Sequence, residues 1–362
     1  MSTDSLRLPQ PLSHARRDRA HWVLALLGLL LITMTLWAVG HGAVTITPGQ
    51  VAAILAGQLG IHLPWDYTPQ QAAVLLAIRV PRVLLAVLIG GGLAVAGAAM
   101  QGLFRNPLAD PGLVGVAAGS ALAAVATIVL GTTWIPGAVW LAAGFSLPLA
   151  AFLGGLLATA LIYRLATTAG RTDVATLLLA GIAINAVAGA GTGLLTYMAD
   201  DQQLRTLTFW SMGSLGSATW SMVTVCAPLI VLAVLAITRL ARALNLLLLG
   251  ESEAIHLGIT VGRVKRWLVI WVALAVGAAV AAAGIIGFVG LVVPHLLRLM
   301  LGPDHRYLLP GCVLLGASLL LSADLLARTV VVPAELPIGI VTALVGGPFF
   351  IWLLLRQRRL WS

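Results

Sequence analysis

The 362-residue chain has few charged residues and almost no lysine. Charged side chains make up 9% of the residues, whereas a soluble domain carries about 25%. Lys265 is the only lysine among the 21 basic residues. So little charge cannot coat a water-soluble globule, which excludes a cytosolic enzyme, a secreted domain and a disordered tail. With 60% hydrophobic residues and a mean hydropathy of +1.03, the sequence predicts an all-α integral membrane protein.

Motifs that would supply chemistry are also missing. Lys265 lies in the segment Gly-Arg-Val-Lys-Arg rather than in a Gly-Lys-Ser/Thr turn, so the chain has no P-loop for a nucleotide. No His/Cys cluster has metal-ligand spacing, and no Ser-His-Asp set stands out, so we expect no catalytic residue, metal ion or cofactor. Cys226 and Cys312 lie inside apolar stretches, which favours packing over a disulfide. The net charge of +9 forms no basic patch with nucleic-acid motifs, so no nucleic-acid partner is expected.

Hydrophobic runs near the length of about 20 residues that crosses a bilayer recur along the chain. They predict ten transmembrane helices, of which the eighth is short and holds Pro294 and His295. The predicted spans are Trp22–Val39, Val83–Leu103, Leu113–Leu130, Trp140–Leu161, Val174–Met198, Trp220–Leu240, Trp267–Phe288, Val289–Leu301, Leu308–Leu326 and Pro337–Leu355. Residues 1–21 then form a cytoplasmic segment, and residues 22–362 form one transmembrane domain.

The basic residues orient these spans. With the N-terminus inside, only Arg79, Arg82, Arg205 and Arg328 of the 21 basic residues fall outside, and the other 17 lie on the cytoplasmic side. This is a strong positive-inside bias. An even number of spans returns the C-terminus to the cytoplasm as well.

One acidic residue, Asp324, lies inside a confident span. A buried acid could be the coupling-ion site of a secondary transporter. Arg328 follows at i+4 on the same helix face, however, and an intrahelical ion pair is the interpretation we favour. The chain then has no energy source of its own.

The cytoplasmic loop at about residues 245–265 differs from its neighbours. In Leu246–Gly258, Gly250 interrupts the apolar run, Glu251 and Glu253 favour a helix start, and Gly258 suits a helix end. The pattern predicts a short helix of about two turns. It could lie on the membrane surface, but its two carboxylates would oppose anionic headgroups, so insertion into a cytoplasmic partner is favoured.

On the outer side, Arg79 and Arg82 flank Pro81 on one face at the head of the second span, and Arg328 ends the ninth. These cations could snorkel to lipid phosphates. They could also dock an acidic protein surface, where such charges set on-rate and register. The residues alone leave both readings open.

Several longer motifs resemble one family. They are Arg79-Val-Pro-Arg82, the run Gly97–Gly112 with Asn106-Pro-Leu108-Ala-Asp-Pro, Gly287–His295, Gly302-Pro-Asp304-His305-Arg306 and Ala334-Glu335-Leu-Pro-Ile-Gly339. From about residue 75 to the C-terminus the sequence is similar to the ten-helix permeases of ATP-binding-cassette importers for iron-siderophores, haem and vitamin B12. The resemblance implies a permease with two inverted halves, spans two to five and seven to ten, in a bacterial inner membrane. The first 75 residues match only as a first helix and a variable loop, which leaves the role of residues 40–75 open.

The resemblance also implies partners and sites. A second copy of the chain would complete the path through the membrane, two ATPase subunits would bind inside, and a periplasmic binding protein would deliver substrate. By position, binding-protein docking falls to Arg79, Arg82 and Arg328. ATPase coupling falls to Glu251, Ser252, Glu253, Ala254, Leu257 and Gly258. The cytoplasmic gate falls to Asn106, Leu108, Val174 and Ala175, although the last two are apolar where some relatives carry hydroxyl groups.

For the substrate, the stretch Leu207–Gly216 is closer to haem and siderophore permeases than to the vitamin B12 type, so haem is expected first, a ferric siderophore second and vitamin B12 third. His295 is the histidine placed well inside a span. We expect it to be structural, satisfying a local hydrogen bond, rather than a haem ligand.

Overall fold

A computed structural model of the chain describes residues 14–42, 44–134, 146–168, 171–331 and 334–358. Its elements are almost all helical. In chain order they are α1 (His14–Gly40), α2 (Pro48–Gly57), α3 (Pro69–Ala73), the π-helix η1 (Val74–Arg79), α4 (Val80–Leu103), the 3-10 turn η2 (Pro111–Val114), α5 (Val116–Trp134), α6 (Ser146–Leu165), the two-residue antiparallel strands β1 (Thr167–Thr168) and β2 (Arg171–Thr172), α7 (Val174–Met198), α8 (Asp201–Ser211), α9 (Trp220–Arg239), α10 (Ala241–Leu247), α11 (Glu251–His256), α12 (Val261–Ala283), α13 (Val289–Leu301), α14 (His305–Thr329) and α15 (Ile338–Arg358).

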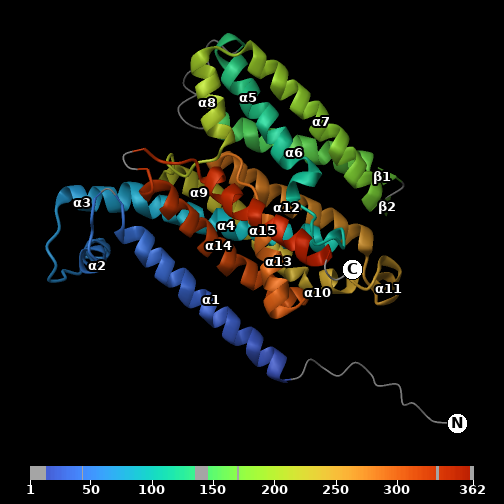
Figure 1. The fold of residues 1–362 in the computed structure, drawn as a ribbon, viewed down its shortest axis with the longest axis horizontal. Coiled ribbons are helices and arrows are strands. Elements are labelled where there is room, and N and C mark those ends of the chain that lie inside the picture. The colour runs from blue at the N-terminus through green and yellow to red at the C-terminus, as the bar shows by residue number, and fades with distance from the viewer. Residues whose placement is uncertain (1–13, 43, 135–145, 169–170, 332–333, 359–362) are drawn as a thin grey trace.

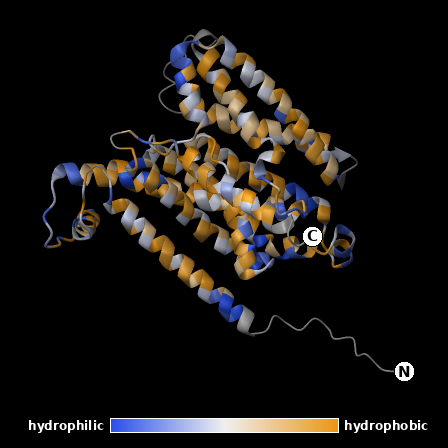
Figure 2. Ribbon diagram, in the orientation of Figure 1, coloured by the Kyte–Doolittle hydropathy of each residue, from blue (hydrophilic) through white to orange (hydrophobic). Residues whose placement is uncertain are grey.

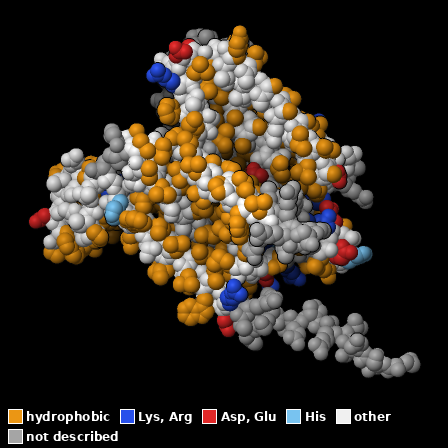
Figure 3. Space-filling view, in the orientation of Figure 1, with side chains coloured by type: hydrophobic (Ala, Val, Ile, Leu, Met, Phe, Trp, Pro, Cys, Tyr) orange, Lys and Arg blue, Asp and Glu red, His pale blue; other side chains and the backbone are white. Residues whose placement is uncertain are grey.

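The predicted all-α membrane fold is confirmed. Within the described ranges, seven helices are long and apolar enough to cross a bilayer, and the shorter apolar helices Val116–Gly131, Val289–Leu301 and Ile338–Leu353 occupy the three remaining predicted spans. Hydrophobic residues run along the helices, and the hydrophilic ones gather at helix ends and in loops (Figure 2). Hydrophobic side chains are spread over the face seen in Figure 3, and most of the charged side chains visible there lie near its margins. Such a surface suits a lipid environment.

Several predicted spans begin or end elsewhere than the hydrophobic runs indicated. The seventh was expected at Trp267–Phe288, but α12 begins at Val261 because its basic first turns stay helical, and it ends at Ala283, before Gly284 with φ +70°. The third was expected from Leu113, but α5 starts only after Gly115, which has φ +80°. In the fourth, expected at Trp140–Leu161, residues 140–145 lie outside the described residues, and α6 runs from Ser146 to Leu165.

Some helices form the buried centre of the bundle, and others lie around it with most of their surface exposed. In Figure 1, α4, α9 and α12–α15 make up the middle, α1 lies along one side against α14, and α5–α8 form a group on the other side. The most apolar window of the helix that contains α4 is 83% buried, whereas the corresponding windows of α1 and α7 are 17% buried. The chain is therefore assembled around α4, and α1 and α7 present most of their surface outward.

Residues 44–73 belong to the stretch whose role the sequence left open, and they form an outer segment with two short helices. Both α2 and α3 begin with a capping box, Thr47 with Gln50 and Thr68 with Gln71. The two glutamines are also joined, since Gln71 Nε2 donates to Gln50 Oε1 at 3.3 Å. The segment then enters α4 through the π-helix.

Glycines allow α4 to lie backbone to backbone against two neighbours. A Cβ atom added to Gly97 would be 1.8 Å from the carbonyl oxygen of Gly290 in α13, and one added to Gly90 would be 2.3 Å from that of Gly316 in α14. Apolar surface gains little by moving from lipid to a neighbouring helix, so membrane helices associate largely through such close packing. These glycines hold the centre of the bundle together.

Replacing Gly97 with alanine should therefore destabilise the protein. The added methyl group meets backbone rather than a flexible side chain, and overpacking of this kind lowers the free energy of unfolding by about 1–3 kcal/mol. Thermal unfolding of the detergent-solubilised protein measures the effect. Gly28→Ala is the control, because a Cβ at Gly28 would meet nothing within 4 Å. Equal midpoints for the two variants would contradict the packing argument.

Candidate functional site

A cluster of charges lies at the outer end of the bundle, with Arg82 at its centre. Arg82 donates from Nε to Asp324 Oδ1 at 2.9 Å, and from its two terminal nitrogens to both oxygens of Glu335 at 2.9 and 3.0 Å. The Arg82 and Asp324 side chains are 8% and 1% exposed, whereas that of Glu335 is 43% exposed. Arg82 thus joins α4 to α14 and to the connection that leads into α15.

The predicted pair within α14 is present but is not the main one. Arg328 Nε lies 3.5 Å from Asp324 Oδ2, without a hydrogen bond, while Arg82 Nη2 lies 2.8 Å from Asp324 Oδ1. Asp324 is therefore shared by two guanidinium groups. This leaves it poorly suited to bind a coupling ion.

Arg79 and Arg328 donate hydrogen bonds to backbone carbonyl groups at the end of α1. Arg79 donates to the carbonyl oxygens of Val39 and Gly40 at 2.9 and 2.8 Å, and also to that of Val44. Arg328 donates to the carbonyl oxygens of Ala38 and His41. The last carbonyl groups of a helix lack intrahelical donors and carry partial negative charge, so two cations are well placed there.

The three arginines of the docking prediction are not free surface cations. Arg79 and Arg82 are buried, the Arg328 side chain is 7% exposed, and all three guanidinium groups bond within the chain. They do not snorkel to lipid phosphates either. Glu335, an acid in the motif Ala334–Gly339 on the same outer side, was the signal in the sequence that could have indicated an ion pair with one of these arginines. Docking itself stays a prediction.

On the cytoplasmic side, the predicted short helix exists in a narrower form. The prediction covered Leu246–Gly258, whereas α11 spans Glu251–His256 and is separated from α10 by Leu248–Gly250. Gly258 follows the helix with φ +85°, the left-handed conformation that glycine adopts without strain. The backbone N–H of Glu253 and the Ser252 hydroxyl hold the pKa of the Glu253 carboxyl below its usual value.

Lys265 ties α11 to the rest of the protein. Its Nζ donates to Glu251 Oε2 at 2.7 Å and to the carbonyl oxygen of Thr172 at 2.8 Å, and the residue is buried. The sequence reasoning used Lys265 only to exclude a P-loop and missed this role. A lone lysine placed 14 residues after a glutamate in one loop was the available signal.

The predicted gate residues lie at the ends of two helices. Asn106 and Leu108 are exposed in the loop after α4, where the Asn106 side chain accepts a hydrogen bond from the Leu108 backbone at 2.9 Å. Val174 and Ala175 open α7, next to its N-cap Asp173. The Thr176 hydroxyl, and then its backbone N–H, lower the pKa of the Asp173 carboxyl. In the described part of the chain no hydrogen bond joins the two pairs, and their gate role stays a prediction.

His295 lacks the local hydrogen bond expected of it. Neither ring nitrogen has a partner among the described residues, and the ring meets Phe349 edge-on with the centroids 6.0 Å apart. A structural role for this side chain consequently rests on packing.

Replacing Arg82 with glutamine tests the outer cluster. The change leaves Asp324 buried without its nearest cation, and breaking one partner of a buried ion pair costs about 3–5 kcal/mol of stability. Thermal unfolding in detergent measures it. Arg205→Gln changes an exposed arginine of α8 on the same side and should shift the free energy of unfolding by only about 0.5 kcal/mol. A stable Arg82→Gln variant would show that the cluster does not support the fold.

Comparisons with known proteins agree with this architecture. The FecCD transport family matches residues 29–356. The hemin transport system permease protein HmuU of Yersinia pestis is 49% identical over 92% of this chain and 96% of its own length, and the vitamin B12 import system permease protein BtuC of Escherichia coli is 40% identical over 95% and 98%. A solved metal-chelate type ABC transporter in an inward-facing conformation superposes with a TM-score of 0.79 at 32% identity, covering 93% of this chain and 99% of that one. This chain therefore belongs to the FecCD transport family and is a multi-pass membrane permease of the ATP-binding-cassette importer type.

Proposed function

We propose that this chain is the permease of a bacterial haem importer. Two copies form the path through the inner membrane, each as a single transmembrane domain of residues 22–362. Two separate ATPase subunits hydrolyse the ATP, and a periplasmic binding protein delivers haem. The path opens alternately to the two sides. The coupling mechanism rests on two hydrogen bonds of Lys265, one to Glu251 in α11 and one to Thr172 in the segment before α7.

The surface of α11 supports ATPase binding. Ile255 and Leu257 are 59% and 57% exposed, at an end of the protein where the loops are otherwise hydrophilic (Figure 2). Exposed apolar side chains within a polar surround are typical of a protein interface. We assign the ATPase contact to this segment, with Glu251, Ser252, Glu253, Leu257 and Gly258 at its surface. Ala254, the sixth residue of the prediction, is 0% exposed and supports the helix from its inner face.

Lys265 connects the ATPase contact to the proposed gate, so that movement of α11 can reach the start of α7. It holds Glu251 at the first residue of α11 and the carbonyl group of Thr172, two residues before α7. A displacement of α11 therefore acts on the start of α7, where Val174 and Ala175 lie. Asn106 and Leu108 form the other part of the proposed gate, in the loop that follows α4.

Two outward-facing helices support pairing with a second copy. The α7 side chains Leu179, Ile182 and Leu194 are exposed, and so are Leu344 and Ile351 of α15. Lipid covers such surfaces in part. The open glycines Gly189 and Gly193 on α7, where an added Cβ would meet nothing within 4 Å, suit close approach of another helix.

Binding-protein docking is proposed at the outer charge cluster. Three guanidinium groups, from Arg79, Arg82 and Arg328, stand against the two carboxylates of Asp324 and Glu335, so the cluster has a net positive charge. An acidic surface is attracted to it even though the cations are covered. The exposed member, Glu335, is itself an acid. The attraction therefore comes from the covered arginines, and we assign the contact to the rim of the cluster away from this carboxylate.

The choice of haem rests on the 49% identity to the hemin permease. Ferric siderophore and vitamin B12 stay as alternatives, because the chain is also 40% identical to a vitamin B12 permease. Asp324, the acid inside a predicted span, is neutralised by Arg82 and Arg328. These contacts disfavour an ion-coupled secondary transporter.

Lys265→Met should uncouple hydrolysis from transport. Methionine fills the same space but releases both Glu251 and the Thr172 carbonyl group. Loss of one charge-assisted hydrogen bond, about 1.5–3 kcal/mol, corresponds to at least about a tenfold loss of uptake per ATP hydrolysed. Both rates are measured in proteoliposomes that contain the whole importer. Arg263→Gln, an exposed change on the same helix, is the control and should leave both rates unchanged. A Lys265→Met importer with normal coupling would remove the proposed route.

Reconstitution tests the function itself. Proteoliposomes with this permease, its ATPase subunits and haem-loaded binding protein should take up haem only when ATP is present on the ATPase side. Vesicles with the permease alone should take up none, because the chain has no P-loop. Uptake by the permease alone under a proton gradient would overturn the proposal. ATP-dependent uptake of vitamin B12 in place of haem would correct the substrate only.

A further inference from the structure

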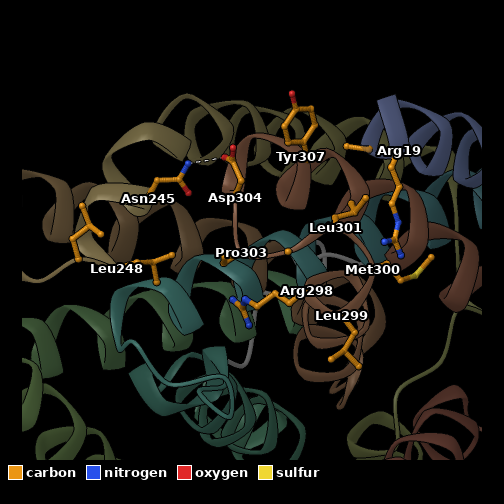
Figure 4. A pocket seen from close by; sticks show the side chains of 13 residues that line it. Arg19, Asn245, Leu248, Arg298, Leu299, Met300, Leu301, Pro303, Asp304 and Tyr307 are labelled. Atoms are coloured by element: carbon orange, nitrogen blue, oxygen red, sulfur yellow. Dashed lines mark hydrogen bonds between the residues drawn. The ribbon is translucent and has the colours of Figure 1, made fainter. Parts of the chain in front are cut away.

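A cavity of about 680 Å³ lies between α1, α10, α13 and α14. Figure 4 shows the side chains that line it, with Arg19 coming from α1, Arg298 from α13 and Tyr307 from α14. The proposed transport cycle uses none of these side chains. The volume lies within the range of about 300–1,000 Å³ that is typical of small-molecule sites.

The cavity carries two cations that no carboxylate neutralises. Within the described residues, neither Arg19 nor Arg298 has an ion pair. Arg298 donates to the side-chain oxygen of Gln101, which fixes its guanidinium group without compensating its charge. The one acid of the lining, Asp304, is already occupied by Arg306 at 3.0 Å and by the Asn245 amide at 2.6 Å. The cavity therefore favours an anion.

Its position corresponds to the cytoplasmic surface of the bilayer. Arg19 stands at the end of the basic N-terminal segment, and the apolar run of α1 begins three residues later with Trp22, which is 71% exposed. An arginine followed by an exposed tryptophan is typical of the membrane interface. On α13, Leu299 and Met300 beside Arg298 are exposed apolar side chains. Cationic and apolar surfaces thus meet at one opening.

We propose that this cavity binds the phosphate group of an anionic phospholipid of the cytoplasmic leaflet. Arg19 and Arg298 supply the positive charge for the phosphate from two helices. An acyl chain extends along Leu299 and Met300. Because α1 contacts the rest of the bundle mainly through α14, a lipid held between Arg19 and Arg298 would also attach the cytoplasmic end of α1.

The test compares lipids on the purified full-length chain in neutral detergent. Phosphatidylglycerol should raise the thermal unfolding midpoint, and phosphatidylcholine should do so much less. Each arginine near an anionic surface accounts for about a fivefold change in affinity, so Arg19→Gln should weaken phosphatidylglycerol binding about fivefold. Arg17→Gln is the matched control, because Arg17 is exposed on the same helix but does not line the cavity.

A second variant tests the other cation of the cavity, Arg298, which is partly buried. Arg298→Gln should weaken the lipid response at least as much, and the exposed Arg19 variant keeps the test valid if Arg298→Gln fails to fold. Three outcomes would overturn the proposal. They are an equal response to inorganic phosphate, equal lipid binding by Arg19→Gln and Arg17→Gln, and a loss of ATPase-subunit binding in Arg19→Gln with lipid binding intact. The last would identify the cavity as a protein interface.

Discussion

A charge inside a membrane protein must have its partner inside the protein as well, and the bond between Arg82 and Asp324 meets this requirement at the outer end of the bundle. In water the two side chains could each be solvated, but between helices in lipid an unpaired charge is strongly unfavourable. Residues 242 positions apart in the chain are therefore held within 2.9 Å. Glu335 and Arg328 extend the pair, so α4, α14 and the entry to α15 share one fixed point.

The same reasoning explains why Arg79 and Arg328 face the end of α1. This helix is mostly exposed, and its contact with the bundle is mainly with α14. Its unsatisfied carbonyl groups need donors, and the two arginines supply them from η1 and from α14. The outer end of α1 is thus attached by hydrogen bonds in addition to the apolar packing of Ala38 and Val39, which are buried. Its cytoplasmic end has no comparable attachment in the described structure.

Much of the fold was open to prediction because membrane insertion leaves a clear signal. The hydrophobic runs predicted α7 and α13 with their observed bounds. Both runs end where the helix does, because Asp173 caps the start of α7 and Gly302 follows the end of α13. Hydropathy failed where a helix continues beyond the bilayer: the basic first turns of α12, which hold Lys265, read as loop. Neighbour rules also identified Arg328 as a partner of Asp324 four residues away, but they could not identify Arg82, because no local pattern reports a contact between distant helices.

Lys265 joins separate elements at the inner end of the bundle, as Arg82 does at the outer end. The two contacts differ in how easily they can be broken. Arg82 joins core helices through a buried pair, and such a pair is costly to separate. Lys265 is buried, yet its partner Glu251 is 40% exposed, so water can solvate that carboxylate if the contact opens. The outer fixed point therefore resists rearrangement, while the inner one can be broken and re-formed at a moderate free-energy cost. The cytoplasmic end of the chain can therefore move with its partner subunits while α4 and α14 stay joined to each other at the outer end.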